Sequence, residues 1–189
     1  DIVIGNPPYG GSKLDEEVCN ALALESKDPY GAFIARFLCS GARFTPLKNN
    51  GILAYIVSDT FMTIKSHLPL RRQMMDNYIH KMIRVDSDTF GATVNTAIIL
   101  CRRNEFGKDN ENQTVRSFDD THNCQMVDMT NVSIQENYGR FIEILQQTEQ
   151  DGENNQISNS EYAIYYYPQS LIRTNSNLPF FVASSKLFG

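Results

Sequence analysis

The first ten residues of the chain, DIVIGNPPYG, join an apolar run to an abrupt backbone stop. The run Ile2-Val3-Ile4 is typical of a buried strand. Pro7 and Pro8 have no backbone N–H groups and cannot continue a central sheet ladder, so we expect the strand to end at Asn6. Each proline also favours extended geometry in the residue before it, which holds Asn6 and Pro7 stiffly. The sequence therefore predicts a preformed row of hydrogen-bond acceptors at the end of a strand.

Helix and strand patterns alternate after this motif. Asp28-Pro29 offers an N-cap and a first helical residue, and apolar residues then repeat on one face up to Pro46. Apolar runs and spacing predict a strand over 52–57, a helix over 70–82, and strands over 82–85 and 96–101. This order favours an α/β fold with a parallel, doubly wound sheet, whose ligands lie beyond the carboxyl ends of its strands. The Asn6–Tyr9 segment follows such an end.

The second half of the chain is less regular. Polar stretches over 105–113 and 146–160 are typical of loops or linkers. Between them, Ser133 and Glu136 form a capping-box pattern ahead of an amphipathic helix that starts near Tyr138. We therefore expect two regions: residues 1–104 with an α/β pattern, and residues 105–189 as a less regular α+β extension.

Composition excludes several classes of protein. With 41% hydrophobic and 21% charged residues, the 189-residue chain has the make-up of a globular domain and not of a disordered tail. It has no run of about 18 apolar residues, so no membrane-spanning helix is expected. Cys19, Cys39, Cys101 and Cys124 form no CxxC pair, which favours reduced thiols and a cytoplasmic location. The three histidines show no metal-ligand spacing with the cysteines, so no metal site is expected.

Charge is unevenly distributed, although the net value is only −5. Residues 61–103 hold seven Lys or Arg against three acids, whereas residues 105–161 hold twelve acids against three bases. An acidic chain is not typical of a stand-alone nucleic-acid binder, because affinity for phosphate comes largely from Lys and Arg. Candidates for phosphate contacts lie in the basic region, with Lys65, Arg71 and Arg72 first and Lys81, Arg84, Arg102 and Arg103 as further possibilities. A solvated helix face explains the same residues equally well.

The Asn6-Pro7-Pro8-Tyr9 motif carries the chemistry. An exocyclic amino group on a nucleobase is a poor nucleophile because its lone pair is delocalised into the ring. The Asn6 side-chain oxygen and the Pro7 carbonyl are two acceptors that can engage both N–H hydrogens and favour a pyramidal nitrogen. Tyr9 offers a flat face for an extruded base, and stacking contributes about 1–3 kcal/mol per base. The alternative is a proline turn that only caps a strand.

The motif resembles the catalytic motif of amino-group methyltransferases that use S-adenosylmethionine, most closely the adenine-N6 DNA enzymes of restriction-modification and phage-defence systems. The resemblance covers residues 1–103. The segments Asp28–Ile34 and Asn50–Val57 are similar to the family's next helix and strand, although Ser58-Asp59 stands where members often carry a proline. The segment Phe90–Leu100 resembles a motif that follows later in the sequences of this family. This resemblance implies that Phe90 approaches the flipped base from the side opposite to Tyr9.

The resemblance implies a catalytic role for Asn6, Pro7, Pro8 and Tyr9, with double-stranded DNA as a partner. In this motif order the methyl-donor residues lie mostly upstream of Asp1, and Gly10-Gly11 lacks the fingerprint spacing of such a site. We therefore expect the chain to be the C-terminal part of a methyltransferase catalytic domain followed by the start of a target-recognition region. On this reading its remaining partner is the N-terminal part of the enzyme, and the chain alone is inactive.

Two alternatives remain open. RNA guanine and protein glutamine methyltransferases use a similar four-residue motif to hold an amino or amide nitrogen, although the long downstream extension favours DNA. A non-catalytic recognition or assembly module of a defence complex would explain the missing donor motifs and the acidic second half. Strand 1–5 would also have an unpaired edge, which favours self-association.

Overall fold

The computed structural model describes residues 1–38, 46–90, 95–104, 106–108, 114–116, 121–150, 157–175, 177 and 180. The strands in this part of the chain are β1 (Ile2–Gly5), β2 (Ile52–Ser58), β3 (Tyr78–Val85), β4 (Thr96–Arg102), β5 (Phe106–Lys108), β6 (Thr114–Arg116), β7 (Asn123–Met129), β8 (Ile157–Ser158) and β9 (Ala163–Pro168). The helices are α1 (Glu16–Ala21), α2 (Pro29–Leu38), α3 (Leu68–Met75), α4 (Tyr138–Gln150) and α5 (Gln169–Arg173), with 3-10 turns η1 (Asp59–Met62), η2 (Lys65–His67) and η3 (Ser87–Phe90).

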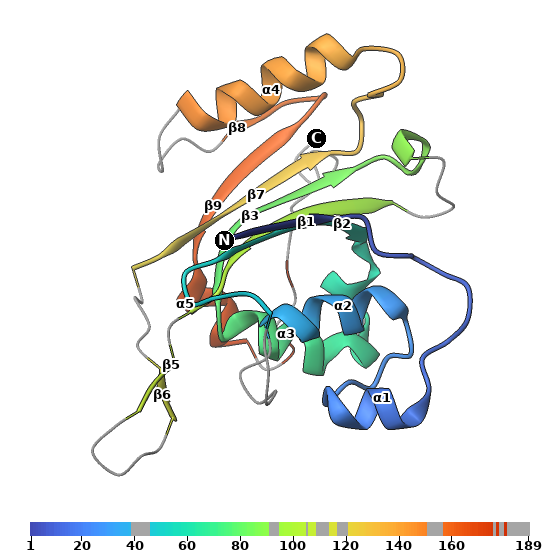
Figure 1. Cartoon of the computed structure of the whole chain (residues 1–189). Coiled ribbons are helices and arrows are strands. Elements are labelled where there is room, and N and C mark those ends of the chain that lie inside the picture. The colour runs from blue at the N-terminus through green and yellow to red at the C-terminus, as the bar shows by residue number, and fades with distance from the viewer. Residues whose placement is uncertain are drawn as a thin grey trace.

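A mixed seven-stranded sheet crosses the molecule in the order β1-β2-β4-β3-β7-β9-β8, and β5 and β6 form a separate hairpin (Figure 1). The sequence prediction of an α/β fold is confirmed, but the expected all-parallel sheet is not. The pairs β1–β2 and β3–β7 are parallel, whereas β4 is antiparallel to both of its neighbours, β2 and β3. The connection from β3 to β4 spans only residues 86–95, which is too short for the crossover of a dozen or more residues that a parallel pair needs.

The two apolar faces of the sheet carry different helices. Helices α1, α2 and α3 lie on one face and α4 lies on the other (Figure 1). Side chains alternate along a strand, so β3 supplies Met82 to the core beneath α2 and α3, and Ile83 to the core beneath α4. Ile34 of α2 and Ile144 of α4 are fully buried in these two cores. Both faces of the central strands are therefore covered, as their continuous apolar runs predict.

The helix expected over 70–82 ends early. Helix α3 stops at Met75 and β3 begins at Tyr78, because Asn77 closes the turn between them. The buried Asn77 amide donates to the Gln73 carbonyl and to the Leu38 carbonyl, and its oxygen accepts from the Asn104 N–H. The apolar spacing fits a helix as well as a buried strand, so it did not reveal this boundary.

The predicted boundary between residues 104 and 105 does not separate two sheets. Strand β7 pairs in parallel with β3, and β9 pairs antiparallel with β7, so the second half of the chain extends the sheet of the first half. The predicted amphipathic helix is confirmed as α4. Its N-cap is Asn137, whose side-chain oxygen accepts from the Arg140 N–H at 3.0 Å, while Ser133 accepts from the Glu136 N–H just before the helix.

Three of the four cysteines, Cys19, Cys101 and Cys124, are buried and free, and Cys39 lies outside the described residues. Burial raises the pKa of the Cys124 thiol to about 12, which keeps the thiol protonated and unreactive at neutral pH. Every helix in the described ranges is too short or too polar to cross a lipid bilayer.

Candidate active site

The Asn6-Pro7-Pro8-Tyr9 segment follows directly on the carboxyl end of β1. Pro7 is buried, whereas the side chains of Asn6 and Pro8 are exposed. Tyr9 is half-buried, and burial raises the pKa of its phenol. Its hydroxyl oxygen is buried without a hydrogen-bond partner among the described residues. The segment is thus anchored at Pro7 and presents the Asn6 amide to solvent.

Asp1 lies at the opposite end of β1 from this segment. Its side chain is exposed, and its carbonyl oxygen accepts from the Ile52 N–H at 2.9 Å, which starts the pairing of β1 with β2. Asp1 is therefore a structural residue of the strand and no part of the candidate site. The sequence prediction that methyl-donor residues lie mostly upstream of Asp1 concerns residues outside the structure, so it stays a prediction.

Close packing beneath the Asn6–Tyr9 segment depends on Gly5. The last residue of β1 pairs with Tyr55 of β2, and a Cβ added at Gly5 would lie 2.9 Å from Cε1 of that ring. Tyr55 is buried and packs edge-to-face against Phe37 of α2, with ring centroids 6.1 Å apart. The absence of a side chain at position 5 therefore lets β2 and α2 support the start of the motif.

Other chain segments converge on the same edge of the sheet. Because β4 is antiparallel to β2 and β3, the carboxyl ends of β1, β2 and β3 and the amino end of β4 all lie there. We call this end of the strands the carboxyl edge of the sheet. The turns η1 and η3 follow β2 and β3 directly, and the Asp59 N–H donates to the Asn95 carbonyl between them. Phe90 is the last residue of η3, so its backbone lies at the same edge as Asn6, while its side chain lies outside the described part of the chain.

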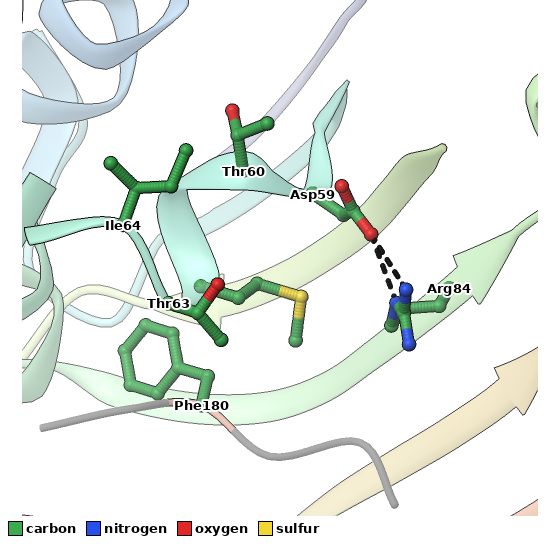
Figure 2. A pocket seen from close by; sticks show the side chains of 7 residues that line it. Asp59, Thr60, Thr63, Ile64, Arg84 and Phe180 are labelled. Carbon is green, nitrogen blue, oxygen red and sulfur yellow. Dashed lines mark hydrogen bonds and ion pairs between the residues drawn. The ribbon is translucent and has the colours of Figure 1, made fainter. Parts of the chain in front are cut away.

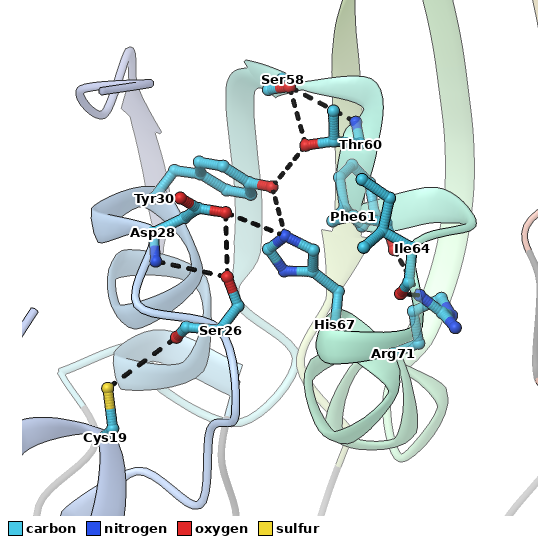
Figure 3. A network of polar contacts seen from close by, with 10 residues as sticks. All are labelled: Cys19, Ser26, Asp28, Tyr30, Ser58, Thr60, Phe61, Ile64, His67 and Arg71. Carbon is cyan, nitrogen blue, oxygen red and sulfur yellow. Dashed lines mark hydrogen bonds and ion pairs between the residues drawn. The ribbon is translucent and has the colours of Figure 1, made fainter. Parts of the chain in front are cut away.

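A polar network beside this edge joins three elements (Figure 3). Ser26 donates to the Asp28 carboxylate at 2.9 Å, and Asp28 Oδ2 lies 3.1 Å from His67 Nε2. The Tyr30 hydroxyl lies 3.0 Å from the same Nε2 atom and 2.9 Å from Thr60 Oγ1. Thr60 in turn contacts Ser58 Oγ at 2.9 Å, at the end of β2. The network therefore connects the start of α2, the turn before α3 and the residues that follow β2.

The protonation of this network follows from its partners. A carboxylate only accepts, so the proton on the His67 ring belongs on Nε2, and the buried Nδ1 has no partner among the described residues. Burial lowers the pKa of His67, although Asp28 opposes that shift, and burial raises the pKa of Tyr30. The Tyr30 hydroxyl is then available to donate to Thr60. A neutral His67 thus holds Tyr30 and Thr60 in one orientation at physiological pH.

A pocket of about 220 Å³ opens next to the network (Figure 2). Its lining combines an apolar side with an ion pair, and consists of Asp59, Thr60, Met62, Thr63, Ile64, Arg84 and Phe180. Arg84 on β3 donates to Asp59 Oδ2 from Nε at 3.0 Å, and its Nη2 lies 2.9 Å from the same oxygen. Thr60 belongs both to the pocket wall and to the polar network.

The structure separates the basic residues that the sequence groups together. Lys65 and Arg72 are exposed, as a phosphate contact requires. The expectation for Arg71 is wrong, because its side chain is 1% exposed and its guanidinium is used internally. Arg71 donates to the carbonyl oxygens of Phe61, Ile64 and Asn177 at 2.7–3.1 Å. Helical spacing did not reveal that Arg71 faces the core while Arg72 faces solvent.

The further basic candidates also have internal partners. Arg84 pairs with Asp59, Arg102 lies 4.3 Å over the ring of Tyr78, and Arg103 donates to the Leu47 carbonyl. Groups of three or more metal-ligating side chains do not occur in the described ranges. From the sequence, His67 is considered only as a metal ligand, and no interaction partner is predicted for Asp59. The Asp28-Pro29-Tyr30 stretch is the one signal that could have pointed to the network.

Comparison with known proteins gives a consistent result. Residues 1–90 match the model of the Eco57I restriction-modification methylase family. A protein of Methanocaldococcus jannaschii, named as a type II restriction enzyme and methyltransferase, is 30% identical over 107 residues, which cover 54% of this chain and 9% of that protein.

Solved structures share the fold at low sequence identity. The methyltransferase subunit of a type I restriction-modification system from Streptococcus thermophilus superposes with a TM-score of 0.62 at 12% identity, covering 94% of this chain and 36% of that one. The modification subunit of a type I restriction enzyme from Vibrio vulnificus YJ016 gives a TM-score of 0.58 at 14% identity, covering 91% of this chain and 34% of that one. The chain thus spans about a third of these subunits and about a tenth of the M. jannaschii protein.

Proposed function

We propose that this chain, whose residues 1–90 belong to the Eco57I restriction-modification methylase family, forms the acceptor side of an amino-methyltransferase site. The proposed reaction transfers a methyl group from S-adenosylmethionine to N6 of an adenine extruded from double-stranded DNA. Asn6 and Pro7 hold the amino group, and Tyr9 and Phe90 hold the ring. Because the chain spans a minor part of its relatives, the activity is proposed for a longer enzyme that contains it.

The exposed Asn6 amide at the carboxyl edge of the sheet is the observation that carries this proposal. Its side-chain oxygen and the Pro7 carbonyl together accept both hydrogens of an adenine amino group, which directs the nitrogen lone pair toward the methyl donor. Asparagine does not take up a proton near neutral pH, so the proton leaves after methyl transfer. The rate then depends on positioning and electrostatics, which fits a segment anchored by the buried Pro7.

The described residues do not fit a binding site for the methyl donor itself. A glycine-rich cofactor turn leads directly into a helix whose N-terminus faces an anionic group. Here Gly10-Gly11 is followed by a six-residue helix that begins only at Glu16 and has Glu16 and Glu17 in its first turn, which disfavour a carboxylate. We therefore assign the donor site to the rest of the longer enzyme, and S-adenosylmethionine supplies the methyl group when bound there.

Lys65 and Arg72 are proposed to contact DNA phosphates beside the site. Both are exposed and lie on the η2–α3 segment, which follows the residues at the carboxyl edge. Replacing either one by methionine should weaken DNA binding about equally for all sequences. It should also reduce the slope of the logarithm of the binding constant against the logarithm of the salt concentration by about 1. DNA titrations at several salt concentrations measure this slope.

Substitution of Asn6 in the longer enzyme tests the mechanism. Asn6→Ala should lower the methyl-transfer rate by about 10²-fold or more, the scale expected for one well-placed polar group. Tyr9→Ala should mainly weaken handling of the extruded base, whereas Tyr9→Phe should be mild because the hydroxyl has no hydrogen-bond partner among the described residues. Asn20→Ala, on the exposed side of α1, is the matched control. Near-normal methylation by Asn6→Ala would overturn the mechanism.

The substrate is tested with a tritiated methyl donor. Label should appear on adenine N6 of duplex DNA. Label found only in RNA or only in protein would instead indicate an RNA guanine or a protein glutamine methyltransferase. Absence of label from DNA, RNA and protein would favour a non-catalytic module of a defence complex.

A further inference from the structure

The pocket at the carboxyl edge has an apolar side and a polar side (Figure 2). Phe180 and Met62 are buried, and the Phe180 N–H donates to the Met62 carbonyl, which fixes the apolar side. Ile64 is 47% exposed at its rim. The polar side is the Asp59–Arg84 pair, which joins η1 to β3. The pocket is therefore a defined cleft that has an apolar side and a charged, hydrogen-bonding side.

The ion pair leaves one carboxylate oxygen and one guanidinium nitrogen unused. Both guanidinium contacts fall on a single carboxylate oxygen, Oδ2 of Asp59. Asp59 Oδ1 and Arg84 Nη1 make no hydrogen bond within the described part of the chain. The pair is partly accessible, with side-chain exposures of 25% for Arg84 and 17% for Asp59. An anionic acceptor thus lies next to a cationic donor at the pocket wall.

We propose that this pocket binds a guanine base, and that under the proposed function this base belongs to a nucleotide near the methylated adenine. The N1–H and 2-amino groups of guanine are adjacent donors suited to a carboxylate, and O6 is an acceptor suited to a guanidinium. Adenine and cytosine offer a single amino group on the same edge. The apolar side of the pocket, with the 47% exposed Ile64 at its rim, would contact the ring.

A base fits this pocket better than a phosphate or a larger ligand. The carboxylate of Asp59 repels a phosphate that Arg84 alone would attract. The volume of about 220 Å³ is below the roughly 300–1,000 Å³ of pockets for drug-sized ligands, so a single ring system is the appropriate size. Flanking nucleotides are a recognised source of sequence preference in enzymes that extrude a base.

The position of the pocket agrees with a flanking nucleotide. β3, which carries Arg84, is the third strand from β1 in the sheet, so about 14 Å separate them at roughly 4.8 Å per strand. This distance corresponds to about four stacked base steps of 3.4 Å. The pocket therefore lies within reach of a base a few nucleotides from the adenine held at Asn6.

Nucleoside titrations of the 189-residue chain test this proposal directly. Guanosine, inosine, adenosine and cytidine are titrated at millimolar concentration and followed by calorimetry or NMR. Guanosine should bind about tenfold more tightly than inosine, which lacks the 2-amino group, and than adenosine or cytidine. Asp59→Asn should remove this preference, because it replaces the charged carboxylate by a neutral amide, which is a weaker acceptor for the two guanine donors.

A second variant and a matched control keep the result interpretable. Thr63→Trp, at an exposed rim position, should block guanosine without touching the ion pair. Glu161→Gln breaks the Arg140–Glu161 pair at the other end of the sheet and should leave binding unchanged. Equal affinity for all four nucleosides, absence of guanosine binding, or binding unaffected by Asp59→Asn and Thr63→Trp would overturn the proposal. These measurements do not depend on methyl transfer, so failure of the pocket and failure of the proposed function are distinguishable.

Discussion

At the scale of single residues, Gly5 shows how a contact can require glycine without any unusual backbone angle. A Cβ at this position would lie 2.9 Å from the buried ring of Tyr55, whereas a Cβ at Gly10 would meet no atom within 4 Å. Gly5→Ala should lower the free energy of unfolding, because overpacking costs about 1–3 kcal/mol and a Gly→Ala change gains only about 0.4–1 kcal/mol through the unfolded chain. Gly10→Ala should be neutral or slightly stabilising. Urea unfolding of both variants measures the difference, and equal stabilities would contradict the proposed packing.

His67 gives the chain a predictable pH dependence. Burial lowers the folded-state pKa of His67 below its ordinary value, so the unfolded chain binds the proton first as the pH falls. The stability is complete above the unfolded pKa of about 6.5 and decreases as the pH drops from there toward the folded-state pKa. His80 contributes with the same sign, because burial and the nearby His122 lower its pKa as well.

A single substitution isolates the contribution of His67. His67→Phe removes the titrating group and retains a ring against Tyr30, which stacks on His67 with centroids 5.5 Å apart. The loss of unfolding free energy between pH 7.5 and pH 5.5 should therefore be smaller in His67→Phe than in the unaltered chain, by at most about 1.4 kcal/mol per pH unit. Denaturant unfolding at both pH values provides the comparison. An unchanged pH slope would mean that His67 does not titrate in this range.

At the scale of elements, Arg71 fastens α3 to the chain that precedes it. Its guanidinium satisfies the carbonyls of Phe61 and Ile64, and it also holds the carbonyl of Asn177 in the C-terminal segment. Arg71→Met should cost at least about 3 kcal/mol, since each buried carbonyl left without a partner costs about 1–3 kcal/mol. The exposed neighbour Arg72→Met should change stability by less than about 0.5 kcal/mol. Equal effects in thermal unfolding would show that the Arg71 contacts contribute little.

Elements defined by local patterns are predictable from the sequence, and contacts between distant residues are not. The strands over 52–57 and 96–101 agree with β2 and β4 because continuous apolar runs mark buried strands. The proline pair likewise places Asn6 at the end of β1. By contrast, the Tyr30–His67 contact joins residues 37 positions apart, and the Asp59–Arg84 pair joins turn η1 to strand β3. Nothing in the local spacing of these residues indicates a partner.

The extent of the sheet also exceeded what the sequence indicates. The polar stretch after residue 104 suggests a boundary, because polar segments are typical of linkers. The β5–β6 hairpin lies in this stretch, and the chain then returns to the same sheet as β7. A polar insertion between two strands of one sheet has the same composition as a linker between two domains, so composition alone does not distinguish them.

For the whole molecule, the exposed edge at β1 leads to the last prediction. In the described sheet β1 pairs only with β2, and Ile2 and Ile4 are 69% and 80% exposed. An apolar edge strand with unpaired N–H and C=O groups is a template for association, so the isolated 189-residue chain should self-associate through β1. Ile4→Lys should shift the chain toward a monomer in light scattering, because a charge on an edge strand opposes pairing. Leu171→Lys, which removes a 59% exposed leucine on helix α5 and leaves every strand unaltered, is the matched control and should leave association unchanged. A monomeric unaltered chain, or association that Ile4→Lys does not reduce, would show that the β1 edge is not the contact surface.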